Sequence, residues 1–252
     1  VVVDDGSTDD RVEVIRATIT DHRLDSVRFE RQDNRGAHHA INRGLELASG
    51  EYLTVLNSDD VYDASRLNRL MPRAAEAGAG VVFSGVRFID EHGAPLAGDS
   101  AWPAWYGRGV AETEDLPTVG FRLLVHNLSV TSGNFLFSRQ LLEGLQGFCG
   151  HRFAHDWDFL LRSTYLADPV LVAPPLLSYR VHGGNTTEQV RRLMEEECGA
   201  SIEAYARLLR SPSPNPLAPC RANWPRYFDR FLATRAPFFR AASAYHDLAI
   251  DW

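Results

Sequence analysis

Two adjacent carboxylates, Asp59 and Asp60, lie two residues after an apolar segment at residues 51–56 that has the composition of a buried strand. Neighbouring carboxylates repel one another unless a cation or hydrogen-bond donors lie between them. Hard oxygen ligands favour Mg²⁺ or Mn²⁺, and these ions keep open positions for substrate phosphates. Because Asn, Ser and Asp are also ordinary turn residues, the sequence predicts either a metal site or a simple polar turn here.

Three other polar groups stand at the ends of predicted elements. Asp4 and Asp5 follow the apolar residues 1–3, and strand ends are where open α/β sheets bind ligands. Asp156 lies at the start of a predicted helix, where a carboxylate is stabilised. His182 follows a predicted strand and precedes two glycines, so its imidazole can swing onto a metal. Each has a structural alternative, since aspartates also turn the chain, cap helices and occupy first turns.

The composition limits the class of protein. The chain has 252 residues, 44% of them hydrophobic, which suits one α/β domain with an appendage. A net charge of -7 without a basic stripe argues against nucleic acid as a partner. Cys149, Cys198 and Cys220 are odd in number and widely spaced, so neither a disulfide framework nor a zinc site is indicated, and a reducing cytoplasm fits best. No apolar run approaches the roughly 20 residues that span a bilayer.

Apolar periodicity predicts two strand-helix units at the start of the chain. Residues 1–3 are expected to form a strand that leads into a helix, with Ser7 and Asp10 at capping-box spacing. Residues 27–31 should form a second strand, and the helix that follows should end at Gly50. With the strand before Asp59, this gives a βαβαβ pattern and a parallel sheet.

The later elements are predicted by the same spacing. Trp102, Trp105 and Tyr106 fall in a segment without clear periodicity, expected to be a long loop, where they stack on a sugar or pack against the core. Residues 81–83 and 86–89 are expected to form two strands or one bent strand. The other predicted elements are a helix at 64–77 interrupted by Pro72, the loop at 96–117, a strand at 135–137, a helix from 139, a helix from 156, strands at 170–172 and 176–181, a helix at 188–209, a linker at 212–219 and an amphipathic segment at 221–252.

Four motifs in this order resemble the family 2 glycosyltransferases of the GT-A fold: DDGSTD, NSDD, HDWDFLLR and YRVHGGNTT. The resemblance covers residues 1–187 and leaves residues 188–252 as a C-terminal helical extension. It implies a Rossmann-like α/β fold, with a mixed, mainly parallel sheet flanked by helices. That family normally opens with a further strand, turn and helix. Their absence predicts an unpaired central edge of the sheet and a nucleotide pocket that lacks one wall.

The resemblance also implies roles for single residues. Asp156 is the expected catalytic base, with His155 standing where Glu is common. Asn57 stands where the metal motif frequently has an acid. The remaining roles are nucleotide-sugar binding by Asp4, Asp5, Asn57 and Asp59, and Mn²⁺ or Mg²⁺ binding by Asp59, Asp60 and His182.

The implied activity is inverting transfer of a sugar from a nucleotide-diphosphate sugar to an acceptor hydroxyl, in polysaccharide or glycoconjugate synthesis. The expected partners are a nucleotide-sugar donor, a sugar, glycan or lipid-linked acceptor, and no nucleic acid. A cytoplasmic location follows, with peripheral association at the inner face of the membrane as an option. The alternatives are a non-catalytic nucleotide-sugar or glycan-binding module and a sugar nucleotidyltransferase, although the Gly-rich, basic phosphate loop expected of the latter is not visible.

Overall fold

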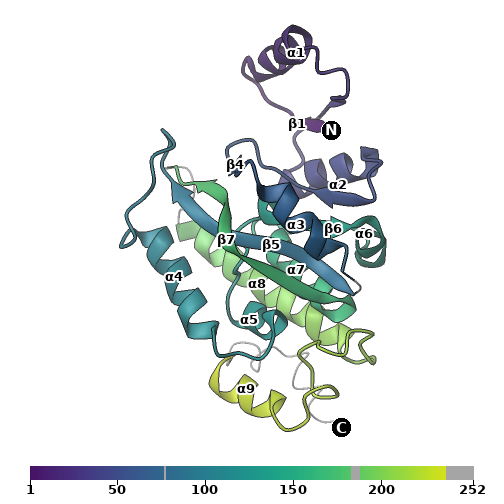
Figure 1. Cartoon of the computed structure of the whole chain (residues 1–252), viewed down its shortest axis with the longest axis vertical. Helices are drawn as coiled ribbons and strands as arrows, with labels where there is room; N and C mark the ends of the chain where they lie inside the picture. The colour runs from purple at the N-terminus through teal and green to yellow at the C-terminus, as the bar shows by residue number, and fades with distance from the viewer. Residues whose placement is uncertain (77, 183–187, 237–252) are drawn as a thin grey trace.

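The computed structural model describes residues 1–76, 78–182 and 188–236, which form helices around two separate sheets. In the smaller sheet, β1 (Val2–Asp5) pairs in parallel with β2 (Phe29–Gln32). The helix α1 (Arg11–Asp21) connects these strands and α2 (Ala37–Leu47) follows them. This N-terminal unit forms one end of the molecule, with α1 at its extremity (Figure 1).

The larger sheet has five strands in the order β3-β6-β5-β7-β4. Its two long strands, β5 (Ala79–Ile89) and β7 (Asp168–Arg180), run in parallel at its centre. Between β5 and β3 (Tyr52–Thr54), β6 (Leu136–Ser138) is antiparallel to both, and β4 (Val61–Tyr62) is antiparallel to β7. Thus β3, β5 and β7 share one direction, and the predicted mixed α/β fold with flanking helices is confirmed.

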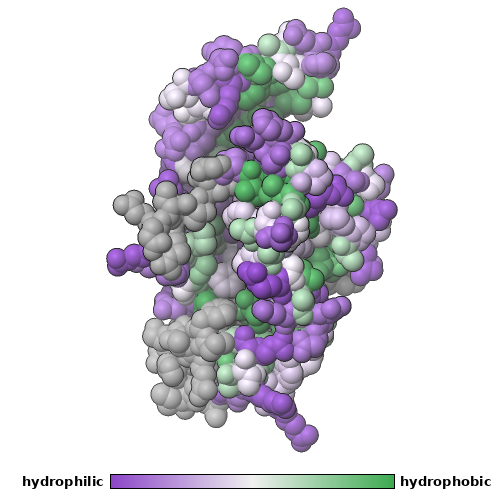
Figure 2. Space-filling view, turned by 90° about the vertical axis from the view of Figure 1, so that its left-hand side faces the viewer, coloured by the Kyte–Doolittle hydropathy of each residue, from purple (hydrophilic) through white to green (hydrophobic). Residues whose placement is uncertain are grey.

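The expected continuous βαβαβ sheet does not form among the described residues. The third strand, β3, pairs with β6 and not with β1 or β2. No described strand bridges β1 and β3, so each sheet keeps an unpaired edge there. Figure 2 shows hydrophobic surface in this upper part of the molecule, where Val1, Val2 and Val14 are exposed.

Residues 81–89 form one strand, the second of the two alternatives expected for them, and residues 170–181 also form one strand. The segments 81–83 and 86–89 join through Gly85, where a β-carbon would lie 2.8 Å from the Ala173 carbonyl oxygen of β7. The segments 170–172 and 176–181 join through Pro174 and Pro175, which lack the backbone N–H that a regular ladder uses. The register between β5 and β7 shifts at this point, so an irregularity accommodates the prolines.

The predicted loop at 96–117 is wrong, because most of it is the helix α4 (Ala101–Thr113). Its proline lies in the first turn, where a missing N–H costs nothing. Trp102 and Tyr106 lie one helical turn apart and pack against Phe88, with ring centroids 6.3 and 5.7 Å away. A second helix, α5 (Val119–Val125), was not predicted either. Packing is therefore the observed use of these aromatic side chains.

The main core lies between the large sheet and α7 (His155–Leu166), and its centre is fully buried at Phe83, Phe159 and Leu160. The same cluster includes Tyr205 of α8 (Glu188–Leu208) and Phe231 of α9 (Phe228–Thr234). The main core therefore contains residues from both sides of residue 187, where the boundary between a catalytic domain and a C-terminal extension is expected. That domain boundary stays a prediction. The remaining helices are α3 (Arg66–Ala74), with Pro72 inside it as predicted, the 3-10 helix η1 (Ser132–Asn134) and α6 (Arg139–Leu145).

None of the helices in the described ranges combines the length and apolar character needed to cross a membrane.

Candidate active site

The turn between β3 and β4 carries an open carboxylate beside an open imidazole. Asp59 Oδ2 lies 3.2 Å from His182 Nε2, and the two side chains are 41% and 43% exposed. Arg180 positions this pair, because its Nε donates to the Asp59 carbonyl oxygen at 2.9 Å. A carboxylate oxygen and an imidazole nitrogen that face solvent together are chemically suited to share a divalent cation.

The neighbouring carboxylate of Asp60 is buried and already engaged. Its Oδ1 accepts the backbone N–H of Arg180 at 3.0 Å, and its Oδ2 accepts Asn57 Nδ2 at 3.2 Å. Burial raises the pKa of Asp60 to about 6, an effect that these donors only partly offset. The structure thus brings Asn57, Asp59, Asp60 and His182 together, and the exposed pair among them is Asp59 and His182, which contact each other.

A second layer of contacts holds this turn in place. The Tyr62 hydroxyl donates to the carbonyl oxygens of Val55 and Gly133. A β-carbon at Gly133 would stand 3.2 Å from both Asn57 and Asp60, so a glycine permits this close approach. Below it, the fully buried Arg66 donates to Asn134 and stacks over the Tyr62 ring at 4.5 Å. No local sequence pattern indicates this buried network, because its members come from distant segments.

Asp156 lies at the start of α7 and is 7% exposed. Its Oδ2 accepts a hydrogen bond from Asn127 Nδ2 at 3.1 Å, and its Oδ1 accepts one from the backbone N–H of Trp157 at 2.7 Å. Burial raises the pKa of Asp156, and the nearby His155 and these two donors oppose the rise. The N-terminus of a helix stabilises the ionised form of a carboxyl and would by itself lower the pKa of Asp156. Because the pKa is raised, desolvation is the larger of the two effects.

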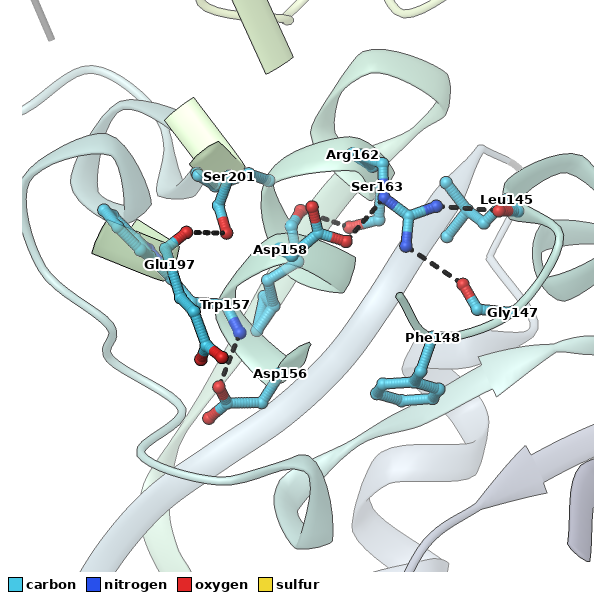
Figure 3. Close-up of polar contacts among 12 residues, drawn as sticks. Leu145, Gly147, Phe148, Asp156, Trp157, Asp158, Arg162, Ser163, Glu197 and Ser201 are labelled. Atoms are coloured by element: carbon cyan, nitrogen blue, oxygen red, sulfur yellow. Dashed lines mark hydrogen bonds and ion pairs between the residues drawn. The ribbon is translucent and has the colours of Figure 1, made fainter. Parts of the chain in front are cut away.

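Asp158, two residues further on, has a structural partner. Its Oδ2 accepts Arg162 Nε at 2.7 Å, and the side chains are only 3% and 16% exposed. Arg162 also donates to the carbonyl oxygens of Leu145 and Gly147, as Figure 3 shows. This ion pair therefore fixes the loop after α6 against α7.

Glu197, which the sequence did not single out, closes the other side of the α7 start. Its carboxylate accepts the backbone N–H groups of Arg152, Phe153 and Ala154 at 2.8 to 3.1 Å. Burial alone would raise the pKa of Glu197, but these three donors lower it. Figure 3 shows its side chain reaching from α8 toward the Asp156 turn. No local motif could have found it, because it lies 41 positions after Asp156.

The charges of both carboxylate groups act on Tyr179. Burial raises its pKa to about 12, and the negative charges of Asp60, Asp59 and Asp156 add to the rise. All three carboxylates are therefore close enough to act electrostatically on one phenol. The β3–β4 turn and the α7 start thus both lie near this side chain.

The N-terminal aspartates are engaged in their own turns. Asp4 accepts the Ser7 backbone N–H at 3.2 Å, and this hydrogen-bonding partner lowers its pKa. Asp5 accepts the backbone N–H groups of Arg35 and Gly36 at 3.0 and 2.8 Å. No hydrogen bond among the described residues links either aspartate to the Asp59 turn.

A row of imidazoles connects α2 with the start of α7. The His38 ring lies 4.4 Å from His39 and 6.4 Å from His155, measured between centroids. Nδ1 of His38 and Nδ1 of His155 are buried without a hydrogen-bond partner among the described residues. Burial lowers the pKa of His38, so its ring is held neutral. Asn42 adds a further link, since its side chain pairs with both backbone polar groups of Phe148.

Comparison with known sequences identifies a match over most of this architecture. The family described as glycosyl transferase family 2 matches residues 1–146, which include the β3–β4 turn and end before α7. Glycosyltransferase GlyG of Streptococcus pneumoniae is 38% identical over 93 residues, 36% of this chain and 30% of that protein. Succinoglycan biosynthesis protein ExoU of Rhizobium meliloti is 37% identical over 91 residues, 36% of this chain and 25% of that protein. The chain therefore spans less than a third of these two relatives.

Solved structures share the fold at low identity. The mannosyltransferase PcManGT from Pyrobaculum calidifontis, in complex with GDP-Man and Mn²⁺, has a TM-score of 0.54 at 18% identity, covering 100% of this chain and 66% of that one. S. aureus TarS 1–349 in complex with UDP-GlcNAc has a TM-score of 0.61 at 14% identity, covering 94% of this chain and 64% of that one. At such identities the likeness concerns the fold alone.

Proposed function

Because the chain belongs to glycosyl transferase family 2, we propose that it moves a sugar from a nucleotide-diphosphate sugar to an acceptor hydroxyl, with inversion at the anomeric carbon. The observation that carries the proposal is the pair of unlike carboxylates near Tyr179: Asp59 is open to solvent beside His182, whereas Asp156 is buried. Inverting transfer needs both kinds of carboxylate. An exposed one would hold the cation at the departing diphosphate, and a buried one would accept the proton of the attacking hydroxyl.

The metal-binding part of the proposal rests on Asp59 and His182. Asp59 Oδ2 and His182 Nε2 pair with each other at 3.2 Å on two exposed side chains, which fits a divalent cation that would take the place of the shared proton. We take Asp59 as the main ligand, because Asp60 would have to release Asn57 or the Arg180 amide to join it. Mn²⁺ or Mg²⁺ bound here would neutralise negative charge on the departing diphosphate.

Asp156 is the proposed general base. Asn127 and the Trp157 amide hold its carboxylate in one orientation, which leaves the group positioned to accept the proton of an acceptor hydroxyl. Burial raises its pKa, and a stronger base gives more assistance to proton removal. The bond to the acceptor oxygen then forms on the face opposite the leaving diphosphate, and no covalent intermediate is needed.

The nucleotide part of the proposal assigns shaping roles to the remaining residues. Asp4 and Asp5 fix the turns after β1 and β2, on which a base would rest, through hydrogen bonds to backbone amides. Asn57 ties the Asp59 turn to Thr131 at 2.8 Å. The acceptor that we propose is a sugar, glycan or lipid-linked saccharide, in keeping with relatives named for polysaccharide biosynthesis.

The test is a thermal-denaturation screen of UDP- and GDP-sugars with and without Mn²⁺, followed by measurement of nucleoside diphosphate release. One donor should raise the melting temperature only with Mn²⁺, since a ligand at 100 times its Kd stabilises the native state by about 2.7 kcal/mol. Release of diphosphate should then depend on an acceptor. Metal-dependent binding without any transfer would indicate a non-catalytic binding module. Pyrophosphate release from a nucleoside triphosphate and a sugar phosphate would indicate a nucleotidyltransferase.

A further inference from the structure

The loop that leads into α7 takes its capping group from another helix. Ala154 occupies the N-cap position of α7 and has no side-chain oxygen to offer. Three successive backbone N–H groups at residues 152–154 converge instead on one carboxylate, that of Glu197 in α8. Successive amides arranged in this way form a concavity suited to an anion. A side chain 43 positions after Ala154 therefore holds the entry to α7.

Both carboxylate oxygens of Glu197 are engaged in this contact. Its Oε1 accepts the amide of Arg152 at 2.8 Å, and its Oε2 accepts those of Phe153 and Ala154 at 2.8 and 3.1 Å. The residue is 9% exposed. Burial opposes ionisation, but the three amides outweigh it and lower the pKa of Glu197. An ionised carboxylate with this set of donors is a fixed charge and a poor acceptor for a substrate proton.

Glu197 is itself anchored by the packing of α8. The hydroxyl of Ser201, one turn further along the helix, donates to the Glu197 carbonyl oxygen at 2.9 Å, as Figure 3 shows. Ser201 is completely buried, and Ile202 and Tyr205 continue α8 into the main core. The carboxylate therefore projects from a segment whose own position is set by the core.

Asp156 lies two residues beyond the last amide that Glu197 holds. It also lies close to α8, because its negative charge adds to the burial that raises the pKa of Cys198, the residue after Glu197. The partner that orients its Oδ2, Asn127, belongs to a different segment. A shift of the 152–154 loop would move the first turn of α7, and with it the Asp156 carboxylate, away from that partner.

We propose that Glu197 is a positioning residue for the general base: by holding residues 152–154 it fixes the first turn of α7 and the carboxylate of Asp156. This inference rests on the proposed function, in which Asp156 accepts the proton of the acceptor hydroxyl. Displacing a reacting group by about 1 Å can cost on the order of 10²-fold in rate. Glu197 lies well beyond residues 1–146, which match the family, so α8 contributes to the reaction from outside that segment.

The experiment is a double-mutant cycle between Glu197 and Asp156 in the full chain, with rates expressed per folded molecule. Glu197→Ala should lower kcat on the order of 10²-fold, while the KM of the donor and the affinity for Mn²⁺ stay near wild type. Glu197→Gln keeps one oxygen for the amides and should lose less. In the Asp156→Asn background, Glu197→Ala should cost no more than about twofold, since no base is left to misplace.

The matched control is Glu196→Ala, which removes the exposed carboxylate next to Glu197 and its ion pair with Arg192. This variant should transfer sugar at the wild-type rate. Wild-type kcat in both Glu197 variants overturns the proposal, and so does an equal loss with and without Asp156, because a general structural role gives additive effects. If Glu197→Ala does not fold, the same cycle with Glu197→Gln decides.

A measurement that needs no turnover separates this inference from the proposed function. The pKa of the Asp156 carboxyl, raised by burial, is followed by carbon-13 NMR titration. Glu197→Ala should admit water at the α7 start and lower that pKa toward its ordinary value, whereas Glu196→Ala should leave it unchanged. If the wild type turns over a nucleotide sugar but neither kcat nor this pKa responds to Glu197, this inference alone fails. If nothing is turned over while the pKa responds, the proposed function fails and the coupling of Glu197 to Asp156 stands.

Discussion

The turn after β3 and the first turn of α7 each carry two aspartates, yet the two regions treat them differently. In the β3–β4 turn the outer carboxylate, Asp59, is open to solvent and the inner one, Asp60, holds the turn. In α7 the proposed catalytic carboxylate, Asp156, is buried, and Asp158 forms an ion pair with Arg162. Each region thus divides its two charges between structure and proposed chemistry. An open carboxylate suits a cation, whereas a desolvated one suits a proton.

The largest expected effect is that of Asp156→Asn on transfer. The variant keeps the shape of the side chain and removes the proton acceptor, so the rate should fall on the order of 10²–10⁴-fold. Binding of donor and metal should stay near wild type, because only the transition state loses an interaction. Steady-state kinetics and calorimetry on one preparation measure both quantities. A variant that transfers sugar at the wild-type rate would remove Asp156 from the mechanism.

Asp158→Asn should act on stability instead. Removing one partner of a buried ion pair costs about 3–5 kcal/mol, because Arg162 keeps its charge without a counterion. Urea denaturation should show this loss, whereas transfer per folded molecule at low temperature should change little. If the variant is as stable as wild type and inactive, the division of roles within α7 is reversed.

Asp59→Asn should weaken metal-dependent nucleotide binding by at least the roughly 10–100-fold that outer-shell changes alone produce. His182→Ala should have a smaller effect, because a carboxylate would still anchor the cation. Asp60→Asn is the matched control, since its side chain already serves Asn57 and the Arg180 amide. The affinity of each variant for Mn²⁺, measured by titration with nucleotide present, ranks the three residues by their contribution to metal binding. A greater loss in Asp60→Asn than in Asp59→Asn would exchange their assignments.

The smallest effect concerns pH. Burial raises the pKa of Asp156 above its ordinary 3.8, so the base becomes protonated at a higher pH than an exposed aspartate. The kcat/KM should therefore fall with acidification at a higher pH than an exposed aspartate would give, and that limb should vanish in the residual activity of Asp156→Asn. The sign for stability is opposite: burial disfavours the ionised form, so this carboxyl stabilises the fold less as pH rises through its raised pKa. Asp156→Asn should accordingly be no less stable than wild type at pH 8.

The sequence predicted the positions of these carboxylates better than their surroundings. Local spacing was sufficient to predict α2, α6 and α7, and to place Asp59, Asp156 and His182 at element ends. It could not assign partners, because Glu197, Asn127 and Arg180 come from segments far along the chain. Asp60 is engaged because the distant Arg180 amide donates to it, whereas Asp59 stays exposed beside His182. The adjacent positions of the two aspartates in the sequence do not indicate this difference.

The errors in the fold have related causes. The aromatic and glycine-rich segment that forms α4 has a helical face toward Phe88, but glycines and a proline masked its periodicity. The predicted parallel pairing of β3 failed because strand order depends on contacts between remote segments, and β6 lies more than 80 residues beyond β3.

The separation of the two sheets has a consequence for local opening of the native state. In α1 only Val12 is buried, and Val14 is 55% exposed, whereas Val81, Val82 and Phe83 of β5 are completely enclosed. Segments with few buried apolar contacts open at a small fraction of the global unfolding free energy. Backbone amides of α1 should therefore exchange with deuterium long before those of β5 and α7. The turns held by Asp4 and Asp5 would then be ordered only part of the time, and a bound nucleotide would slow their exchange more than any other in the chain.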